Sequence, residues 1–209
     1  NEQAFLPDSP AFKNLQKSYI GDGLIRSEVK GYFGDLKVFA DWLRASQYVQ
    51  GQALKTAILA HRLKAPHCMG TLFWHFDDCW PGASWSVIDY HQQKKRSFYE
   101  VERWFSPTIA VFEIQNDTLV LLAHTDIPFA GEVSVRIAHD LDGTVLQTET
   151  LTLSMNALET KKVWQLPLGK WKKGNLPKFR LHLSLINHLA PHNTFEDLHR
   201  FNESPPERM

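Results

Sequence analysis

No excess of charge of either sign marks this sequence, and it contains no long basic block and no long apolar run. The 23 basic residues balance the 23 acidic ones, so nucleic acid is not an expected partner. The short run Lys94-Lys95-Arg96 is interpreted as the solvated start of a helix. Because no apolar stretch approaches the ~18 residues of a membrane span, no membrane partner is expected either.

Cysteine is scarce as well, with only Cys68 and Cys79. An extended chain between them would hold their α-carbons tens of ångströms apart, so we predict two free, buried thiols. His75, Asp77 and Asp78 lie close to Cys79 in sequence, but no His-x-x-x-His or Cys-x-x-Cys spacing supports a metal site. No Gly-x-Ser-x-Gly elbow is present for a nucleophilic serine. We therefore expect no metal and no cofactor.

The first half of the chain has the hydrophobic spacing of helices. Residues 1–30 carry prolines and glycines without a sustained period, which favours loop with one short helix. Apolar spacing then predicts helices over 35–43, 46–64 and 93–105, and the apolar run 69–76 predicts a strand. Helix, strand, loop and helix in this order are typical of a β/α unit.

The second half changes character at Pro107. Short, β-branched segments with period-two alternation follow one another, separated by turn residues. The predicted strands are 108–114, 119–124, 132–138, 145–153, 161–166 and 179–186. Strands without intervening helices predict an antiparallel sandwich of immunoglobulin type. We therefore expect a mixed α and β protein with one domain over 1–106, a β-sandwich over 107–190, and a linker or tail over 191–209.

The segment from Cys68 to Tyr90, CMGTLFWHFDDCWPGASWSVIDY, is the most informative part of the chain. An apolar run of strand length delivers tryptophans and carboxylates into a loop that contains Pro81 and Gly82. Aromatic rings and carboxylates at the carboxyl end of a strand are typical of a sugar site at the mouth of a β/α barrel.

This segment closely resembles the last barrel strand and the following loop of the β-mannosidases in glycoside hydrolase family 2. The run Asp78-Cys-Trp-Pro81 and the run Ser84-Trp-Ser-Val-Ile-Asp-Tyr90 are its most specific parts. The helix motif that begins Gln50-Gly-Gln and the exit Arg103-Trp-Phe-Ser-Pro107 are similar to the family too. The resemblance implies the last helices and last strand of a (β/α)8 TIM barrel, followed by the immunoglobulin-like sandwich.

The resemblance also implies an activity, removal of terminal β-linked mannose by a retaining exo-enzyme that needs no cofactor. Such enzymes use two carboxylates about 5 Å apart, and the family places both upstream of the matching segment. Glu2 follows an asparagine, as the family's acid does, but no strand precedes it. We therefore expect no catalytic residue in this segment, which alone would be inactive and would work with the remainder of the same enzyme chain.

For the sugar site, the resemblance implies that Trp74 stacks under the sugar, with a cis peptide bond to the next residue. Asp78 matches the family's aspartate, while Asp77 replaces its asparagine; either would order the loop or bind a sugar hydroxyl. Trp80 would line the mouth of the site. His75 stands where the family usually has glutamine, so this position departs from the pattern.

Two other interpretations stay open. One is a non-catalytic carbohydrate-binding sandwich module that uses exposed Trp164 or Trp171. The other is a different family-2 glycosidase, a β-galactosidase or a β-glucuronidase, because residues outside this chain would largely set the choice of sugar.

Overall fold

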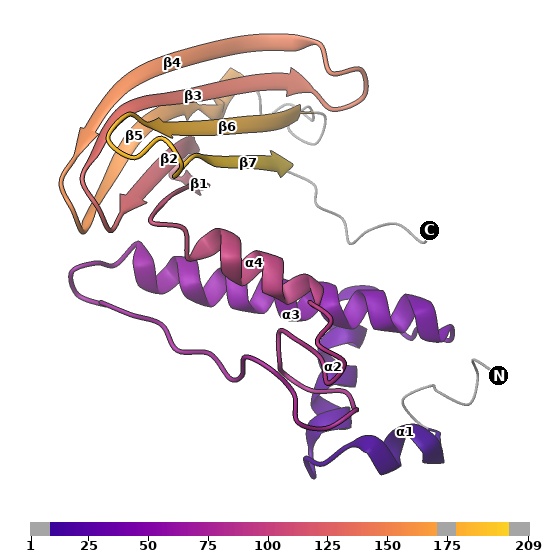
Figure 1. The fold of residues 1–209 in the computed structure, drawn as a ribbon. Coiled ribbons are helices and arrows are strands. Elements are labelled where there is room, and N and C mark those ends of the chain that lie inside the picture. The colour runs from indigo at the N-terminus through magenta and orange to yellow at the C-terminus, as the bar shows by residue number, and fades with distance from the viewer. Residues whose placement is uncertain (1–8, 171–178, 201–209) are drawn as a thin grey trace. The chain divides into compact units, whose positions relative to one another are not determined.

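The computed structural model describes residues 9–170 and 179–200 and divides them into two compact units. Unit 1 comprises residues 9–59 and 71–104, and unit 2 comprises residues 60–70, 105–170 and 179–200. Glu2 and Trp171 lie outside the described residues. The structure is mixed α and β, with helices in the first half of the chain and antiparallel sheets in the second, as expected (Figure 1).

Unit 1 is built from helices. They are α1 (Pro10–Leu15), α2 (Gly21–Phe33), α3 (Phe39–Arg62) and α4 (Arg96–Trp104), of which α3 continues into the first residues of unit 2. Ser9 caps α1 by accepting a hydrogen bond from the backbone N–H of Phe12, and Pro10 occupies the first turn, where no N–H partner is needed. Phe12 packs edge-on against Trp42, with ring centroids 5.3 Å apart, at the centre of a small core.

Several expectations for this half were wrong. The structure has two helices rather than one within residues 10–33, because the three glycines of α2 hide its period without preventing a helix. The predicted helices 35–43 and 46–64 are replaced by the single helix α3. Cys68 is half-buried and Cys79 is exposed; both are free, as predicted, but they are not buried.

The predicted strand 69–76 is absent as a regular strand, and Figure 1 shows an extended connection between α3 and α4 instead. Only isolated bridges involve this region, such as the one between Asp77 and Ile88. A strand needs a neighbouring strand to pair its backbone groups. Unit 1 offers no such strand among its described residues, so the apolar run stays unpaired.

Unit 2 contains two antiparallel sheets. One has the order β1-β2-β5, from β1 (Thr108–Gln115), β2 (Thr118–Thr125) and β5 (Glu159–Pro167). The other has the order β4-β3-β6-β7, from β3 (Phe129–His139), β4 (Val145–Met155), β6 (Phe179–Asn187) and β7 (Phe195–Arg200). A short 3-10 turn, η2 (Leu168–Lys170), follows β5. Phe112 on β1 packs edge-on against Trp164 and lies 6.0 Å from the ring of His199, so the two sheets share one core.

All six predicted strands are present, each extended by one to four residues. Burial alternates along β3 and β6, which is the period-two signal that the sequence carries. The tail predicted over 191–209 was wrong in part, because β7 pairs with β6 there, with Phe195 opposite Leu185. No helix among the described residues is both long and apolar enough to span a bilayer.

Candidate functional site

The segment from His75 to Lys95 forms a loop that closes on itself. The backbone N–H of Val87 donates to the carbonyl oxygens of His75 and Phe76, each at 3.1 Å. Ile88 forms isolated bridges with Asp77 and with Lys94, and the N–H of Lys95 donates to the carbonyl of Val87 at 2.9 Å. The two ends of the loop are therefore tied together by backbone hydrogen bonds, and the aromatic residues lie between them.

Asp78 is the centre of a polar cluster inside this loop, and its side chain is only 7% exposed. Its Oδ2 atom accepts hydrogen bonds from the hydroxyls of Ser84 and Ser86 and lies 3.4 Å from the ammonium of Lys95. Its Oδ1 atom lies 3.5 Å from Nε2 of His75. Lys95 donates in addition to Ser86 Oγ at 2.7 Å and to Ser84 Oγ at 3.1 Å.

Contacts within the cluster favour the charged form of Asp78. Burial opposes the charge of Asp78, but hydrogen bonds from Ser84 and Ser86 and the charge of Lys95 outweigh it and hold the pKa of Asp78 below its usual value. Burial also lowers the pKa of Lys95, against the opposing effect of Asp78 and Asp89. An aspartate with a depressed pKa stays ionised at neutral pH, so the cluster is a buried ion pair supported by two hydroxyls.

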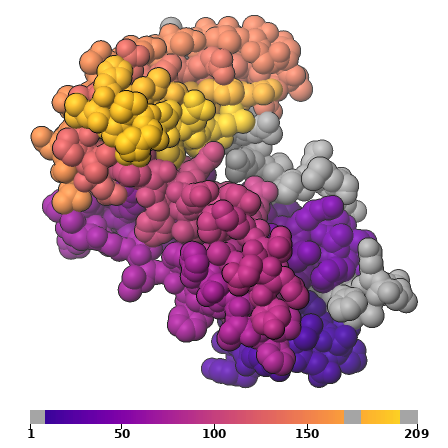
Figure 2. Space-filling model, viewed as in Figure 1, coloured from indigo at the N-terminus to yellow at the C-terminus, as the bar shows by residue number. Residues whose placement is uncertain are grey.

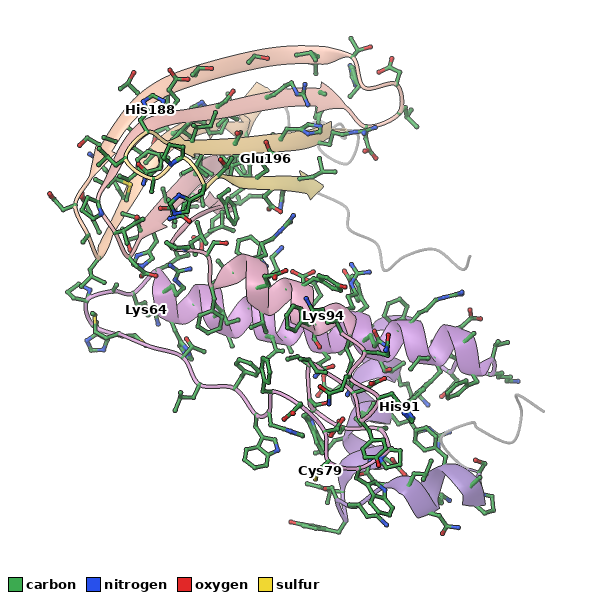
Figure 3. All side chains as sticks on the ribbon, in the orientation of Figure 1. Lys64, Cys79, His91, Lys94, His188 and Glu196 are labelled. Carbon is green, nitrogen blue, oxygen red and sulfur yellow. The ribbon has the colours of Figure 1, made fainter. Side chains whose placement is uncertain are left out.

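Trp74 immediately precedes this cluster and is 79% exposed. Its peptide bond to His75 is cis, as the resemblance implied. Its ring lies 5.2 Å from that of His75. It also lines a cavity of about 600 Å³ in unit 1, together with apolar side chains of α2 and α3 and with Trp85, Tyr90, His91 and Lys95. Figure 3 shows the labelled side chain of His91 in this part of unit 1.

The other two predicted site residues are not among the side-chain partners of Asp78 in the described part of the chain. Trp80 is 44% exposed, its indole N–H donates to the carbonyl oxygen of Leu15 at 3.1 Å, and the ammonium of Lys17 lies 4.1 Å from its ring centroid. Asp77 is exposed and forms the isolated backbone bridge to Ile88. Trp74, Asp77 and Trp80 are therefore exposed, whereas the side chain of Asp78 is turned inward. Figure 2 shows this part of the chain, in magenta, at the surface of the molecule.

Glutamine side chains hold this loop against the helices. Gln50 on α3 donates to the carbonyl oxygens of Trp85 at 2.8 Å and Ser86 at 3.0 Å. Gln47, one turn earlier, accepts from the backbone N–H of Arg96 at 3.0 Å. Gln16 donates to the carbonyl of Ala83 at 3.2 Å. These contacts hold the loop in a fixed position within unit 1.

Comparison with known proteins shows what this chain is similar to. No protein-family model matches the chain. A β-mannosidase from Capra hircus is 28% identical over 149 residues, 66% of this chain and 17% of that protein. A β-mannosidase B from Aspergillus clavatus is 35% identical over 92 residues, 43% of this chain and 11% of that protein. The chain resembles part of a β-mannosidase.

Solved structures agree with this β-mannosidase resemblance. A β-D-mannosidase from Dictyoglomus thermophilum superposes on 96% of the chain with a TM-score of 0.75 and 25% identity, and the match covers 24% of that enzyme. An exo-chitosanase from Amycolatopsis orientalis, at 16% identity and a TM-score of 0.71, shares the fold. The resemblance expected from the sequence is therefore confirmed, and the relatives are glycoside hydrolases. The chain spans less than a quarter of the length of the curated β-mannosidases it matches.

Sequence reasoning missed several residues of this site. Lys95 was interpreted as part of a solvated helix start, but its side chain is 13% exposed and ion-paired with Asp78. Ser84 and Ser86 were recognised only as members of the sequence motif, without a predicted contact to Asp78. Gln50 was recognised only as part of a helix motif. Within residues 9–170 and 179–200 no group of three His, Cys, Asp or Glu side chains is placed to hold a metal ion.

Proposed function

We propose that this chain is a segment of a retaining exo-β-mannosidase that removes terminal β-linked mannose, and that it contributes the aromatic floor of the sugar site. In this proposal, residues 1–106 form the last part of a TIM barrel, and the residues from 107 through β7 form an immunoglobulin-like sandwich. Carbohydrate is the substrate, and the remainder of the same enzyme chain supplies both catalytic carboxylates.

The single observation that supports this function best is the exposure of Trp74 on a loop that is otherwise tied down. Its indole is 79% exposed, while its neighbours in the loop are held by backbone hydrogen bonds and by the Asp78 cluster. A large exposed indole on a fixed support offers a flat apolar surface, which suits the apolar face of a sugar ring. Trp80 and Asp77, also at the surface of the loop, are the further sugar contacts we propose.

The test is hydrolysis of 4-nitrophenyl β-D-mannoside by a longer protein that contains this chain. We expect activity in that protein, none in the isolated 209 residues, and a loss on Trp74→Ala of about 2 kcal/mol in transition-state stabilisation, or roughly 30-fold in kcat/KM. Tyr99→Ala is the matched control, because it removes another exposed aromatic side chain of unit 1, from α4.

Each result has a distinct meaning. Hydrolysis by the isolated chain would show that the catalytic carboxylates have been misplaced. Cleavage of the β-galactoside or β-glucuronide in place of the mannoside would support the other family-2 interpretation. Equal losses in Trp74→Ala and Tyr99→Ala would contradict a stacking role for Trp74.

The alternative interpretation, a carbohydrate-binding sandwich module, relied on an exposed Trp164 or Trp171. Trp164 is 6% exposed, its indole N–H donates to Glu149 Oε2 at 2.8 Å, and its ring packs on Phe112. The expectation that Trp164 is an exposed sugar platform was therefore wrong, because the ring fills the core between the sheets.

A further inference from the structure

We propose that Lys95 is a positioning residue for Trp74, acting through Asp78 and His75. The sugar-binding consequence rests on the function proposed above, whereas the positioning itself is a property of this chain alone. Four links carry the inference, and each is a contact within unit 1.

The first link is the position of the Lys95 ammonium group. Its side chain is 13% exposed, and Nζ has three acceptors: Ser86 Oγ at 2.7 Å, Ser84 Oγ at 3.1 Å and Asp78 Oδ2 at 3.4 Å. A lysine ammonium has three protons to donate. All three are directed to partners in the same loop, so the lysine connects the end of the loop to its beginning.

The second link is the orientation of the Asp78 carboxylate. Its Oδ2 atom accepts from two hydroxyls and faces the ammonium, which leaves Oδ1 directed to His75 Nε2 at 3.5 Å. Rotating the carboxylate to reach a ligand would break contacts on both oxygens in a site that is 7% exposed. Of the two roles that the sequence left open for Asp78, ordering of the loop is therefore the one we assign.

The third link is His75, whose Nε2 atom lies 3.5 Å from Asp78 Oδ1. Its side chain faces Asp78, and its carbonyl oxygen accepts the N–H of Val87 at 3.1 Å. Residue 75 therefore has little freedom to turn while the cluster is intact.

The fourth link is the step from His75 to Trp74. The two residues are adjacent, and their rings lie 5.2 Å apart. Because Trp74 is 79% exposed, few other contacts fix its direction. The path from Lys95 to Trp74 thus runs through one carboxylate and one imidazole, and His75 belongs to this chain where the mannosidase pattern has glutamine.

The experiment has two arms, and the first does not depend on activity. The indole N–H signal of Trp74 is followed by ¹H–¹⁵N NMR in the 209-residue chain and assigned with Trp74→Phe. Lys95→Met is expected to shift or broaden this signal while leaving those of buried Trp104 and Trp164 in place. Lys95→Arg keeps the charge and is expected to restore the signal. Lys94→Met is the matched control, since Lys94 is exposed and lies over the ring of Phe98.

A Trp74 signal that stays in place in folded Lys95→Met would overturn the proposal. Should Lys95→Met fail to fold, Ser84→Ala removes one acceptor of Lys95 and one donor to Asp78 while leaving the ion pair, and the same shift of the Trp74 signal is expected. An unmoved signal in that variant would overturn the proposal equally.

The second arm is a double-mutant cycle on mannoside hydrolysis in the longer protein. Lys95→Met is expected to lower kcat/KM by roughly 10- to 100-fold when Trp74 is present, and to have little further effect in a Trp74→Ala background. Additive losses would show that Lys95 does not act through Trp74. If Trp74→Ala itself leaves kcat/KM unchanged, the proposed function fails, and the NMR arm still decides the positioning.

Discussion

The guanidinium group of Arg62, at the end of α3, donates to Asp126 Oδ2 at 2.7 Å. It also donates to the carbonyl oxygens of Ser106 and Pro107, where the chain enters β1. All four residues belong to unit 2. One side chain thus satisfies the backbone of the connection and the charge of the aspartate that follows β2.

Replacing Arg62 by methionine should destabilise unit 2. The guanidinium is 8% exposed, so its loss removes a donor from Asp126 Oδ2 and from the carbonyl oxygen of Ser106, whereas the carbonyl oxygen of Pro107 keeps the backbone N–H of Asp126 at 2.8 Å. Asp126 is 44% exposed, and water will partly compensate it. We expect a loss of about 2 kcal/mol in the free energy of unfolding, less than for a fully buried pair. Urea unfolding measures it, with Arg44→Met as the control, because Arg44 is 61% exposed and its pair with Asp41 should contribute under about 0.5 kcal/mol.

The stability of unit 2 should depend on pH through His124. Burial lowers the pKa of His124, and the positive charge of Arg62 adds to this effect while Asp126 opposes it. The unfolded chain therefore binds a proton at a higher pH, near 6.5, than the folded one. The free energy of unfolding should be highest above that pH and should fall as the pH drops below it.

His124→Gln should reduce this slope, as measured by urea midpoints between about pH 5 and 7. Burial and two arginines also lower the pKa of His182. His182→Gln should therefore reduce the dependence of stability on pH further. An unchanged slope in His124→Gln would contradict this assignment.

Gly131 should not tolerate a side chain. A methyl group there would lie 1.9 Å from the carbonyl oxygen of Ile186 on the paired strand β6. We expect Gly131→Ala to cost about 3 kcal/mol or more, because backbone atoms cannot move aside as a side chain can. Gly31→Ala is the control, since nothing lies within 4 Å of the added methyl group in α2. It should stabilise the chain by about 0.5–1 kcal/mol. Equal effects of both changes on thermal unfolding would count against the register of β3 and β6.

Trp164 should act on stability and not on sugar affinity. Its ring fills the space between the sheets, so Trp164→Ala should cost about 3–5 kcal/mol in the free energy of unfolding. Calorimetric titration with mannobiose should give the same result for the folded variant as for the parent chain. Sugar binding that is lost in a variant that remains folded would revive the binding-module interpretation.

The antiparallel sheets of unit 2 were predictable because their strands carry a local signal. β3 and β6 alternate buried and exposed positions, and period two is visible in the sequence without any knowledge of partners. β7 escaped prediction because histidine and charged residues occupy most of it, and Phe195 is the one buried residue among 195–199. Pairing with β6, a non-local interaction, makes it a strand.

The sequence predicted the exposed aromatic residues of the candidate loop but not the contacts within it. Trp74 stood out by its motif, and the structure places it on an exposed loop. The sequence did not reveal the partners of Asp78. Lys95 lies 17 residues away from Asp78, and it follows another lysine in a short basic run that is typical of an exposed surface. Burial of one of two adjacent lysines depends on how the loop closes, which spacing along the chain does not report.

The pairing of β3 with β6 also governs how unit 2 reaches its native state. The β1–β2 hairpin needs only the short turn at Asn116 and Asp117, both with positive φ, and can form locally. β6 must instead pair with β3 across the intervening strands β4 and β5, and Gly131 pairs with Asn187 in this register. Closing so long a loop costs chain entropy before any contact repays it. Folding of unit 2 should therefore be limited by this late, long-range step, and the hairpin should form earlier.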